Sequence, residues 1–122
     1  MDNFTFEGAV KWAAENVAST EYREAFAQWA DDRHAGEFES WDDAYDVFES
    51  SYRGVYSAER GFRGQLWATG YVEELLSAGA FDVSEALAPY VDVLALAQDM
   101  ELGGDVSTLE AGWGEVFVFS EV

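Results

Sequence analysis

The chain has 122 residues, and 25 acidic against 6 basic side chains give it a formal charge of -19 at pH 7. Yet 49% of the residues are hydrophobic and 16% are aromatic. A disordered acidic tail would lack these, because it could not offset the entropy cost of ordering its backbone. We therefore expect a folded protein of one domain, or two small ones sharing a core, whose strong negative field is read by a partner.

Composition also argues against several classes of protein. The absence of cysteine excludes disulfides and thiolate metal sites. Direct nucleic-acid binding is disfavoured most firmly, because it requires Lys and Arg to displace phosphate counterions. Residues 1–6 show no basic segment before an apolar run, and no stretch reaches the roughly 20 apolar residues of a membrane span. The expectation is a soluble protein in the cytoplasm of a bacterial host.

Helical periodicity begins early in the chain. Residues 6–17 and 21–33 each repeat apolar side chains at helical spacing, and Ser19 or Thr20 is expected to cap the second helix. The predicted stripes are Phe6, Val10, Ala13 and Val17 in the first helix, and Tyr22, Phe26, Trp29 and Arg33 in the second.

The clearest predicted helix spans residues 41–53, with Ser40 as its N-cap. One side is aromatic and the other is acidic, and eight acids lie between residues 31 and 49 with Arg33 the only base among them. The acids at 42, 43, 46 and 49 span about 10 Å of helix axis. That is about 2.6 Å per charge, comparable with the roughly 1.7 Å per charge of duplex DNA.

Glycines punctuate the middle of the chain. Gly54 is expected to end the preceding helix, and Ser57 to cap a broken one through Glu59, Phe62 and Leu66. A short helix over 71–77 and a single turn at 84–87 should follow.

The C-terminal third combines an apolar helix with strands. Pro89 fits the first turn of a helix running to about Leu102, before Gly103 and Gly104. This helix is apolar on most sides, so it should be buried within the subunit or between subunits. Residues 106–110 and 115–119 read as a β-hairpin. The predicted class is α+β: a mostly helical acidic body over residues 1–80, and a C-terminal α/β subdomain over 81–122 with a small hairpin or sheet.

The sequence shows no catalytic constellation. The single histidine, His34, lies near an expected helix end, where a surface or capping role is more common than catalysis. No P-loop is present. The pairs Asp42 with Asp46 and Asp31 with Asp32 have the residue type that holds Mg²⁺ or Ca²⁺, but the EF-hand spacing is missing. We predict no catalytic residue, no metal and no cofactor, and hence no enzyme.

An acidic fold can instead compete for a protein that binds nucleic acid. Carboxylates fixed on helices would meet the Lys and Arg of a DNA-binding groove, with complementary potentials steering association and salt weakening it. The candidate partner-binding face consists of Asp31, Asp32, Glu37, Glu39, Asp42, Asp43, Asp46, Glu49, Glu59, Glu73, Glu74, Asp92 and Asp99.

Three segments resemble a known family. They are FESSYRGVY at 48–56, YVDVLALAQDMELGGD at 90–105 and VFVF at 116–119. The ArdA family of antirestriction proteins carries a Phe-Glu-x-x-Tyr-x-Gly element, then a Tyr-Ile-Asp helix ending in Asp-Leu-Glu-Leu-x-Gly-Asp, then a short aromatic strand. The chain resembles the middle and C-terminal parts of that family over roughly residues 20–122.

The resemblance implies a specific function. Members of the family are elongated, acidic, dimeric mimics of bent B-form DNA, made by plasmids, transposons and phages, and they occupy the DNA groove of type I restriction-modification enzymes. The resemblance also places a homodimer interface in the C-terminal region, for which the candidates are Tyr90, Val93, Leu94, Leu96, Ala97 and Met100.

The chain departs from the family pattern in two respects. The family's N-terminal, strand-containing domain has no counterpart here, and residues 1–17 are expected to be helical instead. Arg60 and Arg63 interrupt the acidic run.

Two other functions stay open at this point. One is an acidic immunity-type partner that neutralises a basic nuclease toxin. The other is a housekeeping domain whose charge reflects a salt-loving organism or a GC-rich genome. The enzyme targeted, and whether cleavage or methylation is blocked, also stay open.

Overall fold

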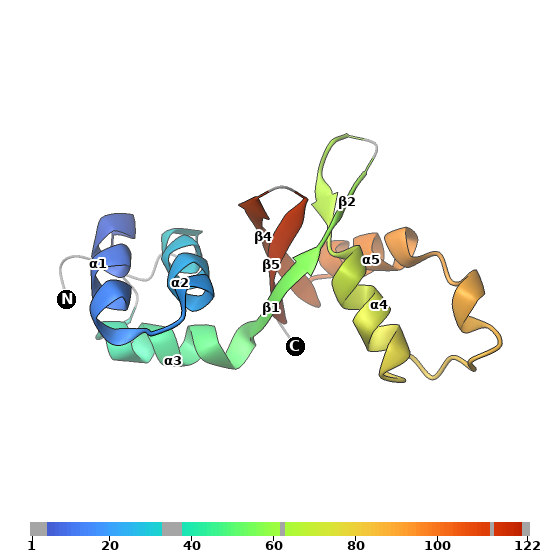
Figure 1. Cartoon of the computed structure of the whole chain (residues 1–122), viewed down its shortest axis with the longest axis horizontal. Coiled ribbons are helices and arrows are strands. Elements are labelled where there is room, and N and C mark those ends of the chain that lie inside the picture. Colours follow the sequence, from blue (N-terminus) through green and yellow to red (C-terminus); the bar gives the residue numbers. More distant parts are fainter. Residues whose placement is uncertain (1–4, 33–37, 62, 113, 121–122) are drawn as a thin grey trace. The chain divides into compact units, whose positions relative to one another are not determined.

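A computed structural model describes residues 5–32, 38–61, 63–112 and 114–120. The chain divides into two compact units, Met1–Tyr52 and Arg53–Val122 (Figure 1). In the first unit, the described residues before Tyr52 form helices and the connections between them. The second unit combines helices with antiparallel strands, so the α+β class is confirmed. The domains predicted over residues 1–80 and 81–122 stay a prediction, and the compact units divide after Tyr52. The reason is that the segment after Tyr52 supplies a strand to the C-terminal sheet and a helix that packs on the C-terminal helix.

The first unit contains α1 (Phe6–Asn16), α2 (Thr20–Asp32) and α3 (Trp41–Ser51). Each helix starts at a capping side chain: Thr5 accepts from the Gly8 N–H, Ser19 from the Tyr22 N–H and Ser40 from the Asp43 N–H, at 3.0, 3.3 and 3.1 Å. The predicted caps at Ser19 and Ser40 are therefore confirmed. The helix expected over 41–53 ends earlier, at Ser51, because Tyr52 and Arg53 already belong to the next strand.

An arginine fixes the connection between α1 and α2. The Nε of Arg23 donates to the Val17 carbonyl, and its Nη2 donates to the Ala14 carbonyl at 3.2 Å. Both acceptors lie at the C-terminal end of α1, where carbonyls lack partners within the helix. The two helices lie side by side, and α3 crosses them (Figure 1).

Aromatic rings fill the core of this unit. Phe26 and Phe48 are fully buried with their ring centroids 5.4 Å apart. Around them lie the rings of Trp12, Tyr22, Trp29, Trp41, Tyr45 and Tyr52, at centroid distances of 5.0 to 6.2 Å from a neighbouring ring.

The stripe predicted for α1 is partly wrong. Ala9 and Ala13 are fully buried, whereas Phe6 and Val10 each remain 46% exposed. The small alanines allow α1 to approach α2 closely, and the two larger side chains are left at the flank of the contact. Arg33, His34 and Gly36, for which the sequence made predictions, lie outside the described residues.

The second unit is built around a three-stranded sheet in the order β1-β5-β4. Its strands are β1 (Tyr52–Ser57), β4 (Val106–Gly112) and β5 (Glu115–Ser120). The β4–β5 hairpin is antiparallel, pairs Val106 with Ser120 and Leu109 with Phe117, and has an irregularity between Glu110 and Gly112. The predicted hairpin is therefore confirmed, and residues 116–119 of β5 are all buried because β5 is the central strand.

The helix expected after Ser57 is wrong, because this segment forms a second hairpin. Its strands are β2 (Glu59–Arg60) and β3 (Leu66–Trp67), with Arg60 opposite Leu66. Gly64 has φ +85°, a conformation that side-chain-bearing residues rarely adopt, and the Arg60 Nη1 donates to its carbonyl at 2.7 Å. Phe62, which belonged to the expected helix, lies outside the described residues.

The rest of the second unit is helical. It contains α4 (Thr69–Ser77), one turn near 84–87, the 3-10 helix η2 (Ala88–Tyr90) and α5 (Val93–Leu102). The helix expected from Pro89 starts only at Val93, where the Asp92 carboxylate caps it by accepting from the Ala95 N–H at 3.0 Å. No helix in the described segments is long and apolar enough to cross a membrane.

The core of this unit joins the sheet to the helices. Its buried members are Leu66, Ala68, Tyr71, Val106, Val116 and Val118, and Leu75 and Met100 pack against them.

Candidate functional site: an acidic surface on both units

The acids of α3 all face solvent. Asp42, Asp43, Asp46 and Glu49 are exposed, while Trp41, Ala44 and Phe48 on the opposite side are buried. Asp42 and Asp43 stand in the first turn, where the positive end of the helix dipole favours carboxylates. The structure therefore has the predicted charged and aromatic faces of α3. The carboxylates stand on a regular helix that is packed against the core.

The helix α3 separates its charged face from the aromatic core on its other side. Tyr45 is half-buried, with its ring 5.1 Å from that of Phe26 and 5.5 Å from that of Trp12. Burial, and secondly the nearby Glu49 carboxylate, raise the pKa of the Tyr45 hydroxyl. The Tyr45 ring packs on the aromatic core beside the helix turn that carries Glu49.

The remaining candidate acids of the first unit lie next to α3 in sequence. Asp31 and Asp32 are exposed in the last turn of α2, and Glu39 is exposed just before α3, whereas Glu37 lies outside the described residues. Acids at a helix C-terminus face the negative end of the dipole, and the last turn of α2 holds no base. The dipole of α2 therefore does not favour carboxylates at Asp31 and Asp32.

The candidate acids of the second unit are exposed as well. They are Glu59, Glu73, Glu74, Asp92 and Asp99. Two of them also support the fold, since Asp92 caps α5 and Glu74 is hydrogen-bonded to the Tyr56 hydroxyl. Burial, followed by this hydrogen bond, raises the pKa of Tyr56 to about 12.

Charge is shared almost equally between the units. The first unit has thirteen acids and three bases in its sequence, and the second has twelve acids and three bases. Two arginines are engaged with backbone carbonyls, Arg23 at the end of α1 and Arg60 in the β2–β3 turn. Arg63 lies exposed close to Arg60 in the same hairpin.

One acid that the sequence did not single out has a different environment. Glu101 on α5 is half-buried, and its carboxylate accepts from the Ala68 N–H at 3.1 Å and from the Thr108 hydroxyl at 3.0 Å. Burial raises the pKa of Glu101, and these two hydrogen bonds oppose that rise. No signal in the sequence separates Glu101 from the exposed acids, because its partners come from distant segments.

The apolar residues predicted for a dimer interface fall into two groups. Ala97 is only 1% exposed within one chain, and Met100 is half-buried and packs on the unit's own core. Tyr90 is 85% exposed, and Val93, Leu94 and Leu96 are half-buried. Leu87 and Leu102, which were not predicted, are also exposed, at 60% and 79%.

The described residues contain no group of three or more His, Cys, Asp or Glu side chains able to hold a metal ion. The acids are spread over helix surfaces and are not gathered into a coordination shell. Together, the exposed carboxylates and the aromatic core define a class: an anionic protein with charged helix faces over a packed aromatic core.

Comparison with protein families identifies the family of the chain. The model of the family described as antirestriction protein (ArdA) matches residues 5–115. The chain therefore belongs to the ArdA antirestriction family, which implies antirestriction activity, and the members of this family are inhibitor proteins. Comparison with curated proteins gives no match. Comparison with solved structures gives none either.

Proposed function

We propose that this protein is a non-enzymatic DNA mimic that occupies the DNA-binding groove of a restriction-modification enzyme in a bacterial cytoplasm. The target class implied by the family resemblance is the type I enzymes. The observation that carries the proposal is the acidic face of α3, where Asp42, Asp43, Asp46 and Glu49 are exposed on a helix anchored by buried aromatic rings.

The physical basis is competition for the same cationic groups. Four carboxylates within about 10 Å of helix give a linear charge density close to that of duplex DNA. Because the helix holds them in place, the protein loses little conformational entropy when it meets the Lys and Arg of a groove. The acids of the second unit, which carries nearly the same charge excess, extend the number of basic groups that one chain can neutralise.

We also propose a two-fold homodimer formed through the second unit. The support is the exposed apolar side chains of Tyr90, Leu102 and Leu87, together with the half-buried Leu94. A dimer would cover this apolar surface and would double the charge that one particle displays. The same residues of both copies would meet across the two-fold axis.

A charge-removal experiment tests the acidic face. The combined change Asp42→Asn, Asp46→Asn and Glu49→Gln should weaken inhibition of a type I enzyme by about tenfold or more, because the lost carboxylates no longer attract groove cations. The free energy of unfolding should change little, since exposed carboxylates contribute little to stability. Binding affinity is measured by fluorescence anisotropy and stability by urea denaturation.

A control variant removes the same number of negative charges from another part of the surface. Glu7→Gln, Glu15→Gln and Glu110→Gln together remove three exposed acids outside the proposed face and should weaken inhibition much less. Inhibition that stays at the wild-type level in a folded α3 triple variant, even after the neighbouring acids are also neutralised, would remove this face from the mechanism.

A further inference from the structure

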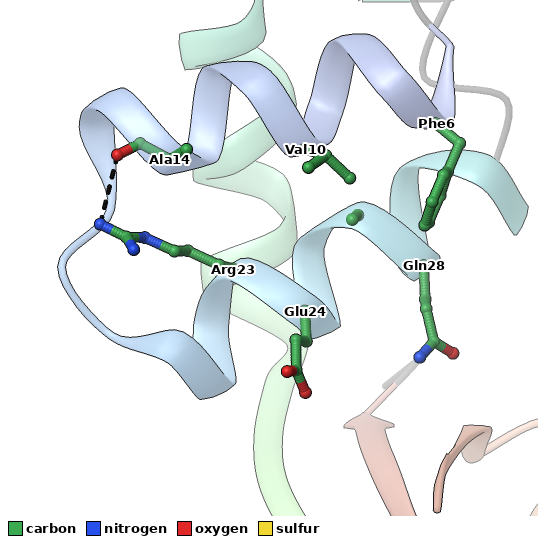
Figure 2. A pocket seen from close by; sticks show the side chains of 7 residues that line it. Phe6, Val10, Ala14, Arg23, Glu24 and Gln28 are labelled. Carbon is green, nitrogen blue, oxygen red and sulfur yellow. Dashed lines mark hydrogen bonds between the residues drawn. The ribbon is translucent and has the colours of Figure 1, made fainter.

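A small apolar pocket lies between α1 and α2. Phe6, Val10 and Ala14 from α1 and Ala27 from α2 line it. Figure 2 shows Phe6 and Val10 directed from α1 toward α2. Phe6 and Val10 are also large apolar side chains of α1 that the helix packing leaves half-exposed. The acidic face described above makes no use of this pocket.

The size of the pocket restricts what it can hold. Its volume is 230 Å³, which is below the roughly 300–1,000 Å³ typical of sites for whole small molecules. Protein interfaces commonly use pockets of this kind to hold a single anchor side chain of the partner. A pocket of this size and lining fits one Leu, Met or Phe side chain.

The charged groups at the rim of the pocket indicate which kind of partner residue would lie next to the bound apolar side chain. The Arg23 guanidinium is directed back to the carbonyls at the end of α1 (Figure 2), where the negative end of the helix dipole offsets its charge. Glu24 is exposed, and it extends from α2 away from α1 (Figure 2). A partner residue next to the pocket therefore meets a carboxylate on a unit with ten more acids than bases.

We propose that the α1–α2 pocket binds one apolar side chain of the target enzyme that is flanked by a Lys or Arg. The identity of the partner rests on the proposed function, whereas the chemistry of the ligand rests on the pocket. Salt screens the attraction of exposed charges but does not weaken apolar burial. The pocket would thus supply a component of binding that persists when the acidic face is screened.

Short peptides test the chemistry of the pocket without the enzyme. The full chain, labelled with ¹⁵N, is titrated with N-acetyl-leucyl-lysine amide and with N-acetyl-alanyl-lysine amide. We expect saturable shifts of the Val10, Ala14 and Ala27 amides with the leucyl peptide, and about tenfold weaker binding of the alanyl peptide. The absence of saturable shifts, or equal binding of both peptides, would overturn the proposal.

A different result is expected if the start of the chain itself occupies the pocket. If the Phe4→Ser variant binds the leucyl peptide and the wild-type chain does not, the start of the chain itself fills the pocket. That result would also overturn the proposal.

A pocket-filling variant tests the role in inhibition. Ala14→Leu fills the pocket from inside and leaves the charge unchanged, and Ala18→Leu makes the same change at an exposed position that does not line the pocket. We expect Ala14→Leu to bind a purified type I modification methyltransferase about tenfold more weakly than Ala18→Leu, by a similar factor at low and high salt.

The outcomes separate the two proposals. Equal affinities of Ala14→Leu and Ala18→Leu for the methyltransferase would overturn the pocket proposal and leave the DNA-mimic function intact. A wild-type chain that does not bind the methyltransferase would contradict the proposed function, while the peptide titration would still decide the chemistry of the pocket.

Discussion

At the C-terminal end of α5, the Glu101 carboxylate links three elements. It joins α5 to Ala68 at the start of α4 and to Thr108 on β4. Glu101 belongs to the Asp-x-Glu-Leu-x-Gly-Asp segment that carries the family resemblance, yet its half-buried position removes it from the proposed acidic face. Glu101 therefore serves the fold of the second unit, and exposure distinguishes it from the twelve candidate acids whose positions are described.

The pH dependence of stability tests this role. Because burial raises the pKa of Glu101 in the folded chain, its contribution to stability is fully present below the ordinary pKa and is lost as pH rises through the folded value. Glu101→Gln imitates the protonated form and keeps partners for the Ala68 N–H and the Thr108 hydroxyl. We expect it to exceed the wild type in free energy of unfolding at neutral pH and to match it at low pH.

An exposed acid on the same helix provides the control. Asp99→Asn removes the same charge without touching the Glu101 hydrogen bonds. Glu101→Ala should be destabilising by about 1–3 kcal/mol, because a buried N–H and a hydroxyl lose their partner. Urea denaturation across pH measures all three variants. If Glu101→Gln and Asp99→Asn follow the same pH curve, Glu101 has no special coupling to the fold.

At the scale of single elements, the helix α3 shows which features the sequence could predict. Its cap at Ser40, its buried Trp41 and Phe48 and its exposed acids all depend on local spacing, and all are confirmed. The β4–β5 hairpin was equally predictable, because two short segments rich in strand-forming residues flank a glycine-containing turn.

The errors arose where distant segments decide the structure. Residues 59–67 have helical spacing at Glu59 and Leu66, but pairing of β2 with β3 and the positive φ of Gly64 make them a hairpin. The exposure of Phe6 depends on how closely the alanines of α1 approach α2. Periodicity within one segment carries no information about such contacts.

Removing the Phe48 ring tests whether the aromatic core holds α3 and its acids in place. Phe48 is fully buried, and its ring contacts those of Phe26, Trp29 and Tyr52. Phe48→Ala should lower the free energy of unfolding by about 3–5 kcal/mol, because it leaves a cavity among the aromatic rings. The same substitution should reduce inhibition although no charge is lost. A change below about 1 kcal/mol in urea denaturation would contradict a rigid aromatic support for α3.

At the scale of the whole molecule, the dominant property is a charge of -19 shared by two units. Such an excess destabilises a compact chain through self-repulsion. The aromatic core of the first unit and the sheet-centred core of the second offset that repulsion. The proposed function explains why the chain retains this repulsion, because the same charges would bind the target.

Charge placed on the exposed apolar surface tests the homodimer. Tyr90→Glu with Leu102→Glu should convert the dimer to monomers without unfolding, because both side chains are exposed within one chain and each change counts twice at a two-fold interface. Val47→Glu, an exposed apolar position on α3, is the control and should leave the dimer intact. Light scattering at micromolar concentration gives the masses. A monomer mass for the wild type would contradict the dimer.

The proposal that this protein takes the place of DNA is tested most directly by competition. A fluorescent duplex carrying a recognition site is bound to a type I modification methyltransferase, and the full chain is added while anisotropy is followed. We expect complete displacement of the duplex, with an apparent affinity that falls steeply as salt is raised. A ternary complex of enzyme, duplex and inhibitor would contradict DNA mimicry, even if the chain still inhibited restriction.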